Sequence, residues 1–192
     1  LFNNLDTIPS DGFFTQVSYK GAFPAGSGFW LSGLSWLDEN ARIPADEDVE
    51  VNCGDITSDT TWTKDKTYVM SCQIAVTNSA VLTIEAGTTV KAYPAALDGF
   101  APTLIVTQGS RIMAEWTTTQ PITFTTAVSE SNLPARGLWG GLIILGNAQA
   151  QGSAPRYVEG VSNYQYGGSS DTDNSGVLKY VRVWYGGHMI SQ

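Results

Sequence analysis

Two cysteines, Cys53 and Cys72, are the residues of this chain that could form a disulfide or bind a metal ion. No histidine, further cysteine or carboxylate accompanies them at the spacing of a metal site, and their neighbours are typical of two strands lying side by side. The spacing therefore favours a disulfide, which forms in oxidising compartments. The alternative is a pair of buried free thiols, because unpaired cysteine is itself among the most buried residue types.

A short acidic turn, Asp171-Thr-Asp-Asn-Ser-Gly176, could wrap oxygen ligands around Ca²⁺. Asp171 and Asp173 would supply the charge, and Asn174 or backbone carbonyls would complete the coordination. The turn lacks the acidic residue that closes an EF-hand loop. An ordinary turn stays open as the alternative, because Asp, Asn and Gly tolerate tight backbone geometry without any ion.

Charged residues that could act as catalysts are few in the β-rich region and do not cluster at a regular spacing. They are Glu85, Lys91, Arg111, Glu115, Lys179 and Arg182. Glu85 and Glu115 stand thirty residues apart and would resemble the carboxylate pair of a glycosidase if they stacked. His188, the single histidine, has no serine or cysteine partner in a strained turn, which favours a packing role. We therefore predict no catalytic residue.

A repeated apolar pattern predicts the elements that position these residues. The segment from Ile74 to Leu82 and the segment from Leu104 to Ile112 repeat one pattern thirty residues apart. Apolar and polar residues alternate in short bursts, which indicates half-buried strands, and Gly, Asn or Ser between the bursts indicates corners. Three such strands make one coil of a parallel β-helix, whose coils must stack to bury their inward faces. The sequence therefore predicts an all-β solenoid.

Equivalent positions of stacked coils should form inward ladders with a spacing of about 4.8 Å. We expect Val76, Val106 and Ile144 to line one ladder, and Leu82 and Ile112 to line another. Loops rich in Pro, Gly, Ser and Asp should leave the solenoid at its corners. These loops are expected at residues 93–102, 129–136 and 149–172.

The chain divides into two parts. Residues 1–48 are rich in aromatic residues and Gly without a long periodic pattern, and we interpret them as a capping or linking segment. Residues 49–192 form the predicted parallel β-helix domain. We interpret the acidic run from Ala45 to Glu50 as a solvated linker between the two parts.

The composition limits the classes of partner. The 192 residues carry a formal net charge of −8, with ten Lys and Arg against eighteen Asp and Glu. Such a surface repels phosphate backbones, so we expect no nucleic-acid partner. No apolar run is long enough for a membrane span. The chain begins at Leu1 without a signal-peptide pattern, so we expect a processed product or a piece of a longer protein.

Several segments of the sequence resemble segments of a known protein family. They are residues 82–92, 136–148, 159–160, 166–168 and 173–187. In order and spacing they are similar to the secreted bacterial right-handed parallel β-helix proteins of the pectate-lyase-like superfold, many of them lipoproteins or surface proteins of unassigned function. The resemblance implies a right-handed parallel β-helix, and in this chain an aromatic-rich segment precedes it at the N-terminus.

The six tryptophans have two interpretations. They could stack on sugar rings if several were exposed in a row. The resemblance implies instead that Trp139 lies in a stacked strand and Trp184 in the next coil, where each indole would bury a large apolar area. We favour packing for most of them, and an exposed pair near Trp116 would reverse that interpretation.

The aromatic block of residues 1–40 resembles a segment that in the family follows the final coil. We hypothesise that it caps the C-terminal coil of the next chain by strand addition and aromatic burial, a contact that propagates as a filament unless it closes. The alternative is a fragment whose missing coils cover that edge. The expected interface residues are Phe13, Phe14, Tyr19, Phe23, Trp30, Trp36, Val181, Val183 and Tyr185.

Three functions are expected from these observations. The first is a non-enzymatic structural or interaction module of a secreted or cell-surface bacterial protein, which associates with itself or with another surface protein. The second is a carbohydrate-binding or polysaccharide-lyase-like β-helix, with a polysaccharide as ligand. The third is a Ca²⁺-dependent adhesin domain. We expect no cofactor other than that Ca²⁺.

Overall fold

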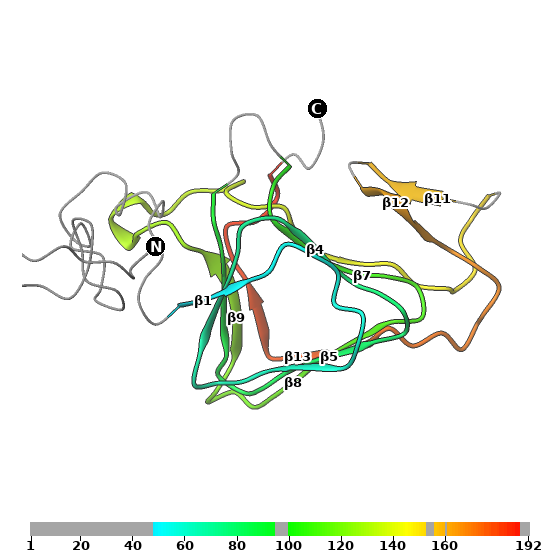
Figure 1. The fold of residues 1–192 in the computed structure, drawn as a ribbon, viewed down its shortest axis with the longest axis horizontal. Helices are drawn as coiled ribbons and strands as arrows, with labels where there is room; N and C mark the ends of the chain where they lie inside the picture. The colour runs from blue at the N-terminus through cyan, green and yellow to red at the C-terminus, as the bar shows by residue number, and fades with distance from the viewer. Residues whose placement is uncertain (1–47, 95–99, 153–155, 160, 189–192) are drawn as a thin grey trace, which may run out of the picture.

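Stacked coils of β-strands make up the fold. The computed structural model describes residues 48–94, 100–152, 156–159 and 161–188. Within these residues the chain winds into coils that superpose as a triangle, whose sides are parallel sheets (Figure 1). The all-β architecture predicted from the repeats is confirmed, and it is consistent with a right-handed parallel β-helix.

The strands are short, as expected for a chain that turns a corner after each one. Those within the described residues are β1 (Asp48–Val51), β2 (Thr60–Trp62), β3 (Thr67–Met70), β4 (Gln73–Val76), β5 (Val81–Ile84), β6 (Thr89–Ala92), β7 (Thr103–Val106), β8 (Arg111–Glu115), β9 (Ile122–Thr126), β10 (Gly141–Ile144), β11 (Arg156–Val158), β12 (Val161–Tyr166), β13 (Gly176–Lys179) and β14 (Val181–Val183). A single 3₁₀ turn, η1 (Glu130–Asn132), lies in the loop after β9.

Three parallel sheets form the sides of the triangle. Sheet A has the strand order β1-β3-β6-β9-β14, sheet B has β10-β7-β4, and sheet C has β13-β8-β5-β2. Each complete coil therefore adds one strand to every sheet. Ile56 extends sheet B by a bridge to Val76 in the first coil.

The inward ladders have the register that the repeats predict. Val106 pairs with Val76 on one side and with Ile144 on the other, and Leu82 pairs with Ile112. Four of these five side chains are fully buried, but Ile144 is 38% exposed. Ile144 lies in the last described coil, and no described strand is stacked on the far side of β10.

The corners require left-handed backbone. After β4 the chain turns through Asn78 and Ser79, with φ of 57° and 60°, and after β7 it turns through Gly109, with φ of 80°. Asn is one of the few residues with a side chain that enters this region readily, and Gly enters it without steric cost. The small polar residues between the apolar bursts thus mark the corners, as predicted.

The described part of the acidic run, Asp48 to Glu50, is not the solvated linker that its charge suggested, and residues 45–47 lie outside the described residues. Asp48 to Val51 form β1, which pairs in parallel with β3 and starts sheet A. Val51 packs against the hydrophobic core. Polar and apolar residues alternate through Asp48-Val-Glu-Val51, so one face of the strand can be buried while the carboxylates remain on the other.

The long insertion before β13 also differs from the expected loop. It contains the antiparallel hairpin β11–β12, which lies outside the triangle (Figure 1). Val161 of this hairpin, 3% exposed, forms a second hydrophobic cluster with Leu145 and with Ala75 and Ile105 from the outer face of sheet B. A sheet face that the alternation pattern would leave to solvent is therefore covered.

The predicted disulfide joins Cys53 to Cys72, whose Cα atoms lie 5.8 Å apart. Cys53 follows β1 and Cys72 follows β3, and these strands are neighbours in sheet A. The bond therefore staples the first coil. No helix among the described residues is long and apolar enough to cross a membrane.

Candidate functional site

The last described coil exposes apolar side chains that occupy inward register positions. Leu178 pairs with the buried Ala114, and Val183 pairs with the buried Phe124. Leu178 is nevertheless 45% exposed and Val183 is 48% exposed, because no described strand lies beyond them. We call Ile144, Leu178 and Val183 the tail surface.

The tail surface also has a free strand edge. β14 pairs with β9 on one side, and no strand within the described ranges pairs with its other side. Trp184 and Tyr180, the residues beside β14, are 46% and 49% exposed. Unpaired backbone groups next to exposed apolar side chains form a template for another strand.

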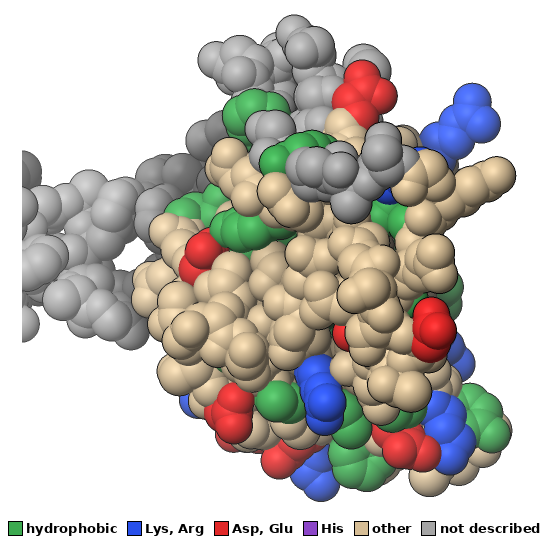
Figure 2. Space-filling model, turned by 90° about the vertical axis from the view of Figure 1, so that its right-hand side faces the viewer, with side chains coloured by type: hydrophobic (Ala, Val, Ile, Leu, Met, Phe, Trp, Pro, Cys, Tyr) green, Lys and Arg blue, Asp and Glu red, His purple; other side chains and the backbone are tan. Residues whose placement is uncertain are grey.

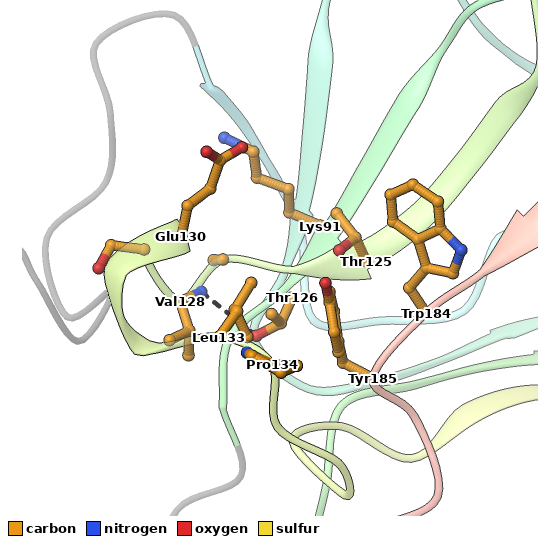
Figure 3. Close-up of a pocket in the computed structure, with 11 residues that line it drawn as sticks. Lys91, Thr125, Thr126, Val128, Glu130, Leu133, Pro134, Trp184 and Tyr185 are labelled. Atoms are coloured by element: carbon orange, nitrogen blue, oxygen red, sulfur yellow. Dashed lines mark hydrogen bonds between the residues drawn. The ribbon is translucent and has the colours of Figure 1, made fainter.

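A groove of about 560 Å³ lies on the outer face of sheet A (Figure 3). Thr125 and Thr126 of β9 line it, and the loop from Val128 to Pro134 forms one wall. Trp184 and Tyr185 stand on the opposite side of the groove in Figure 3. The charged side chains that line it are Lys91 and Glu130.

Hydrogen bonds fix the backbone around this groove. The Val128 amide donates to the Thr126 hydroxyl at 3.2 Å and secures the start of the loop. The Trp184 carbonyl accepts from the buried Trp139 indole at 2.8 Å. Tyr185 then has a left-handed φ of 61°, which turns the chain immediately after β14.

Two cations lie in or beside the groove, Lys91 in its lining and Arg182 next to Trp184. The Arg182 guanidinium carbon lies 5.6 Å from the centroid of the Trp184 ring, within the range of a cation–π contact. Lys91 Nζ lies 3.6 Å from Asp48 Oδ1. An exposed aromatic face, threonine hydroxyls and charges of both signs suit a ligand that has both apolar and polar surface.

The two carboxylates considered as a catalytic pair have separate partners. Glu85 accepts a hydrogen bond from the Lys64 amide at 3.1 Å. Glu115 accepts one from Lys179 at 2.7 Å, and this hydrogen bond is the main cause of the raised pKa of Lys179. Each glutamate thus has a role in joining segments of the coils.

His188 and the tryptophans of the solenoid largely have packing roles. His188 Nδ1 lies 2.6 Å from the Gly137 carbonyl, at a corner of the last coil. Trp62 and Trp139 are 3% and 0% exposed, and Trp116 donates its indole N–H to the Ile84 carbonyl at 3.0 Å. Trp184 is the exception, because it is 46% exposed where the resemblance implied burial.

The predicted calcium turn is held by hydrogen bonds. Asp173 Oδ2 accepts from the Asn147 amide at 3.0 Å and from the Ser175 hydroxyl at 3.3 Å. Asn174 Oδ1 accepts from the Gly176 amide at 2.9 Å. No group of three or more His, Cys, Asp or Glu side chains that could hold a metal occurs in the described part of the chain. Ca²⁺ binding with Asp171 stays a prediction, which melting with and without a chelator tests.

The expected assembly residues fall into two groups. Phe13, Phe14, Tyr19, Phe23, Trp30 and Trp36 lie outside the described residues. Of the others, Val183 belongs to the tail surface, Val181 packs against the core and Tyr185 lines the groove.

Ile144 and Leu178 complete the tail surface, and the sequence analysis did not assign either of them to an interface. Their signal was present in the repeat, since both are apolar residues at inward positions of the coil that is the last among the described residues.

Charged side chains are scattered on the side of the molecule shown in Figure 2. Red and blue side chains lie mainly around its rim, and uncharged polar groups and backbone occupy its centre. This face therefore lacks the single-sign patch that would attract a strongly charged polymer.

Comparison with known families agrees with the coil architecture. The family described as a pectate-lyase-like beta helix domain matches residues 54–192, which is more than half of the chain. The chain belongs to this family. No curated protein and no solved structure matches it. Within this pectate-lyase-like β-helix, the match begins just after β1 and includes the tail surface and the residues lining the groove.

Proposed function

We propose that this β-helix is a non-enzymatic interaction module of a secreted or cell-surface bacterial protein, and that its tail surface docks β-structure from another molecule. The observation that carries the proposal is the exposure of Leu178 and Val183, 45% and 48%, at register positions that are buried in the preceding coil. Exposed apolar patches next to a free strand edge are typical of interaction sites.

The mode of docking follows from the geometry of the edge. A strand added to β14 would form main-chain hydrogen bonds along it, and its inward side chains would cover the exposed Val183. The occupant is a second copy or another surface protein. The disulfide between Cys53 and Cys72 supports an oxidising, extracellular setting, because such bonds persist outside reducing compartments.

Sedimentation velocity over a range of concentrations tests the proposal. The wild-type chain is expected to associate, and the double variant Leu178→Lys/Val183→Lys is expected to be monomeric. Phe100→Lys is the matched control, because Phe100 is a 66% exposed aromatic residue outside the tail surface. Association of the double variant as strong as that of the wild type would contradict docking at the tail surface.

A binding partner other than self is tested separately. The chain immobilised through its N-terminus is exposed to purified surface proteins, again with the tail variant as control. An assay of unsaturated uronate products on polygalacturonate tests the non-enzymatic part of the proposal. We expect no product above a protein-free control.

Carbohydrate binding is the second candidate, and the exposed Trp184 in the groove favours it. The face of an indole can stack on the apolar face of a sugar, while Thr125, Lys91 and Glu130 can bond its hydroxyls. Titration of tryptophan fluorescence with soluble polysaccharides is the test. Trp184→Ala should remove any response and Trp184→Phe should retain part of it, whereas an unchanged response would exclude the groove.

A further inference from the structure

We propose that the tail surface docks a second copy of this chain, whose β1 adds to β14 as a parallel strand in the register that sheet A already has. The inference rests on the proposed function and names its partner. It comes from the two ends of one sheet, which carry matching apolar residues and opposite charges.

One inward ladder crosses the whole of sheet A. Its members, in strand order, are Val49, Tyr68, Val90, Phe124 and Val183. The three inner members are 7%, 1% and 0% exposed, whereas Val49 is 37% exposed and Val183 is 48% exposed. The ladder is therefore buried in its middle and apolar but exposed at both ends.

The neighbouring outward ladder has opposite charges at its two ends. Its members are Asp48, Thr67, Thr89, Thr123 and Arg182. The three threonines between the ends are uncharged. β1 therefore carries carboxylates at Asp48 and Glu50 on its outer face, and β14 carries the Arg182 guanidinium.

Continuing the register by one strand joins these ends. If β1 of a second copy takes the place next to β14, its Val49 lies against Val183, at the strand spacing of about 4.8 Å. Its Asp48 then lies beside Arg182, and its Glu50 lies in the ladder position next to Trp184. The apolar ladder and the charge pairing are both satisfied by this register.

A register shifted by one residue would fail on physical grounds. Successive side chains of a strand point to opposite faces, so a slip of one residue would direct Asp48 and Glu50 toward the interior and Val49 to the solvent. Burying a carboxylate without a partner is costly. The alternation in β1 thus excludes a slip of one residue, and the cysteine pairs below distinguish the inferred register from a slip of two, in which Val51 would lie against Val183.

The contact is heterologous, because the head edge of one copy meets the tail edge of the next. It leaves a free head and a free tail on every dimer, so association propagates along the axis of the β-helix unless the ends meet in a ring. Strand β13 of sheet C is not part of the inferred pair.

Cysteine pairing between two copies tests the register. One chain carries Val183→Cys and the other carries Val49→Cys, and they are mixed under mild oxidation. Peptide mapping identifies the joined residues and follows the native bond between Cys53 and Cys72. Thr61→Cys is the matched control on the head end, because Thr61 is exposed on β2 of sheet C rather than on sheet A.

Charge reversal gives an independent readout. Arg182→Asp should weaken association about three- to tenfold, since it places like charges beside each other, whereas Arg182→Lys should retain most of it. Asp48→Lys in the partner copy should restore part of the affinity lost with Arg182→Asp, because Asp48 is the residue that the inferred register places beside position 182. Melting curves of each variant alone verify that the fold is kept.

The outcomes separate this inference from the proposed function. A covalent dimer of the Val183 and Val49 variants, with little product from Val183 and Thr61, supports the register. If Leu178→Lys/Val183→Lys abolishes association but the Val183 and Val49 variants do not link preferentially, the register is overturned. The tail surface then remains a docking site. A chain that is monomeric at all concentrations overturns the self-docking.

Discussion

The hydroxyl of Tyr164 donates hydrogen bonds to both carboxylate oxygens of Asp55, at 3.0 and 2.9 Å. These residues are 109 positions apart in the sequence. Tyr164 belongs to the β12 strand of the inserted hairpin, and Asp55 precedes the first strand of the first complete coil. The contact therefore ties the hairpin, inserted in the last coil, to the opposite end of the stack.

Tyr164→Phe should loosen the hairpin without unfolding the solenoid. The loss of a hydrogen bond to a solvent-exposed carboxylate costs about 1 kcal/mol or less in the free energy of unfolding. Hydrogen exchange should become faster in β11 and β12 and stay unchanged in β7. Equal loss of protection in both places would contradict a local role. Asn163→Ala, at an exposed position of the same strand, is the control.

The Tyr164 hydroxyl should lose its proton at a higher pH than an ordinary tyrosine. Burial, and then the hydrogen bond to Asp55 and its negative charge, raise the pKa of Tyr164 to about 12 from 10.0. Because the folded pKa is the higher one, the stabilising contribution is complete below pH 10 and is lost as the pH rises through 12. Absorbance titration of tyrosinate in wild type and in Tyr164→Phe measures it. A difference spectrum that titrates near 10 would contradict the contact.

Val106→Asp should unfold the β-helix. Val106 is 0% exposed between Val76 and Ile144, and an unpaired carboxylate there costs about 3–5 kcal/mol. Circular dichroism and denaturant melting measure the loss. Thr61→Asp, at an exposed position of β2, should melt close to the wild type. A stable, cooperative Val106→Asp protein would mean that this ladder does not face the core.

Reduction of the disulfide should lower the melting temperature. The bond between Cys53 and Cys72 closes a segment with a sequence separation of 19, which corresponds to about 3 kcal/mol in the chain-entropy model. Mass spectrometry after alkylation without reductant should find no modified cysteine. The double variant Cys53→Ala/Cys72→Ala should melt like the reduced chain and should not respond to reductant.

Gly176→Ala should destabilise the last coil. Gly176 has a φ of 120°, and a Cβ at this position would overlap the carbonyl oxygen of Ile112 on the neighbouring strand. Backbone must move to relieve such an overlap, at a cost of about 2–4 kcal/mol. Gly54→Ala is the matched control, because a Cβ there meets nothing within 4 Å. Similar melting temperatures for the two variants would contradict the close approach.

The sequence by itself determined the repeating part of the fold. The alternation around Ile74 and Val76 recurs at Leu104 and Val106, and the strands pair as that spacing predicts. These are local signals, because strand period and corner residues are encoded within a few positions. The disulfide was also predictable, since the neighbours of both cysteines are typical of strands lying side by side and no metal ligands accompany them.

The tertiary structure decided what depends on neighbours distant in sequence. The charge of Asp48 and Glu50 suggested a linker, but pairing with β3 makes this segment a strand. The hairpin covers Ile105 by packing Val161 over it, and no periodicity in either segment records that contact. The exposure of Ile144 and Val183 likewise depends on which coil each occupies. An inward position is fixed by local alternation, whereas burial requires a further strand to lie over it.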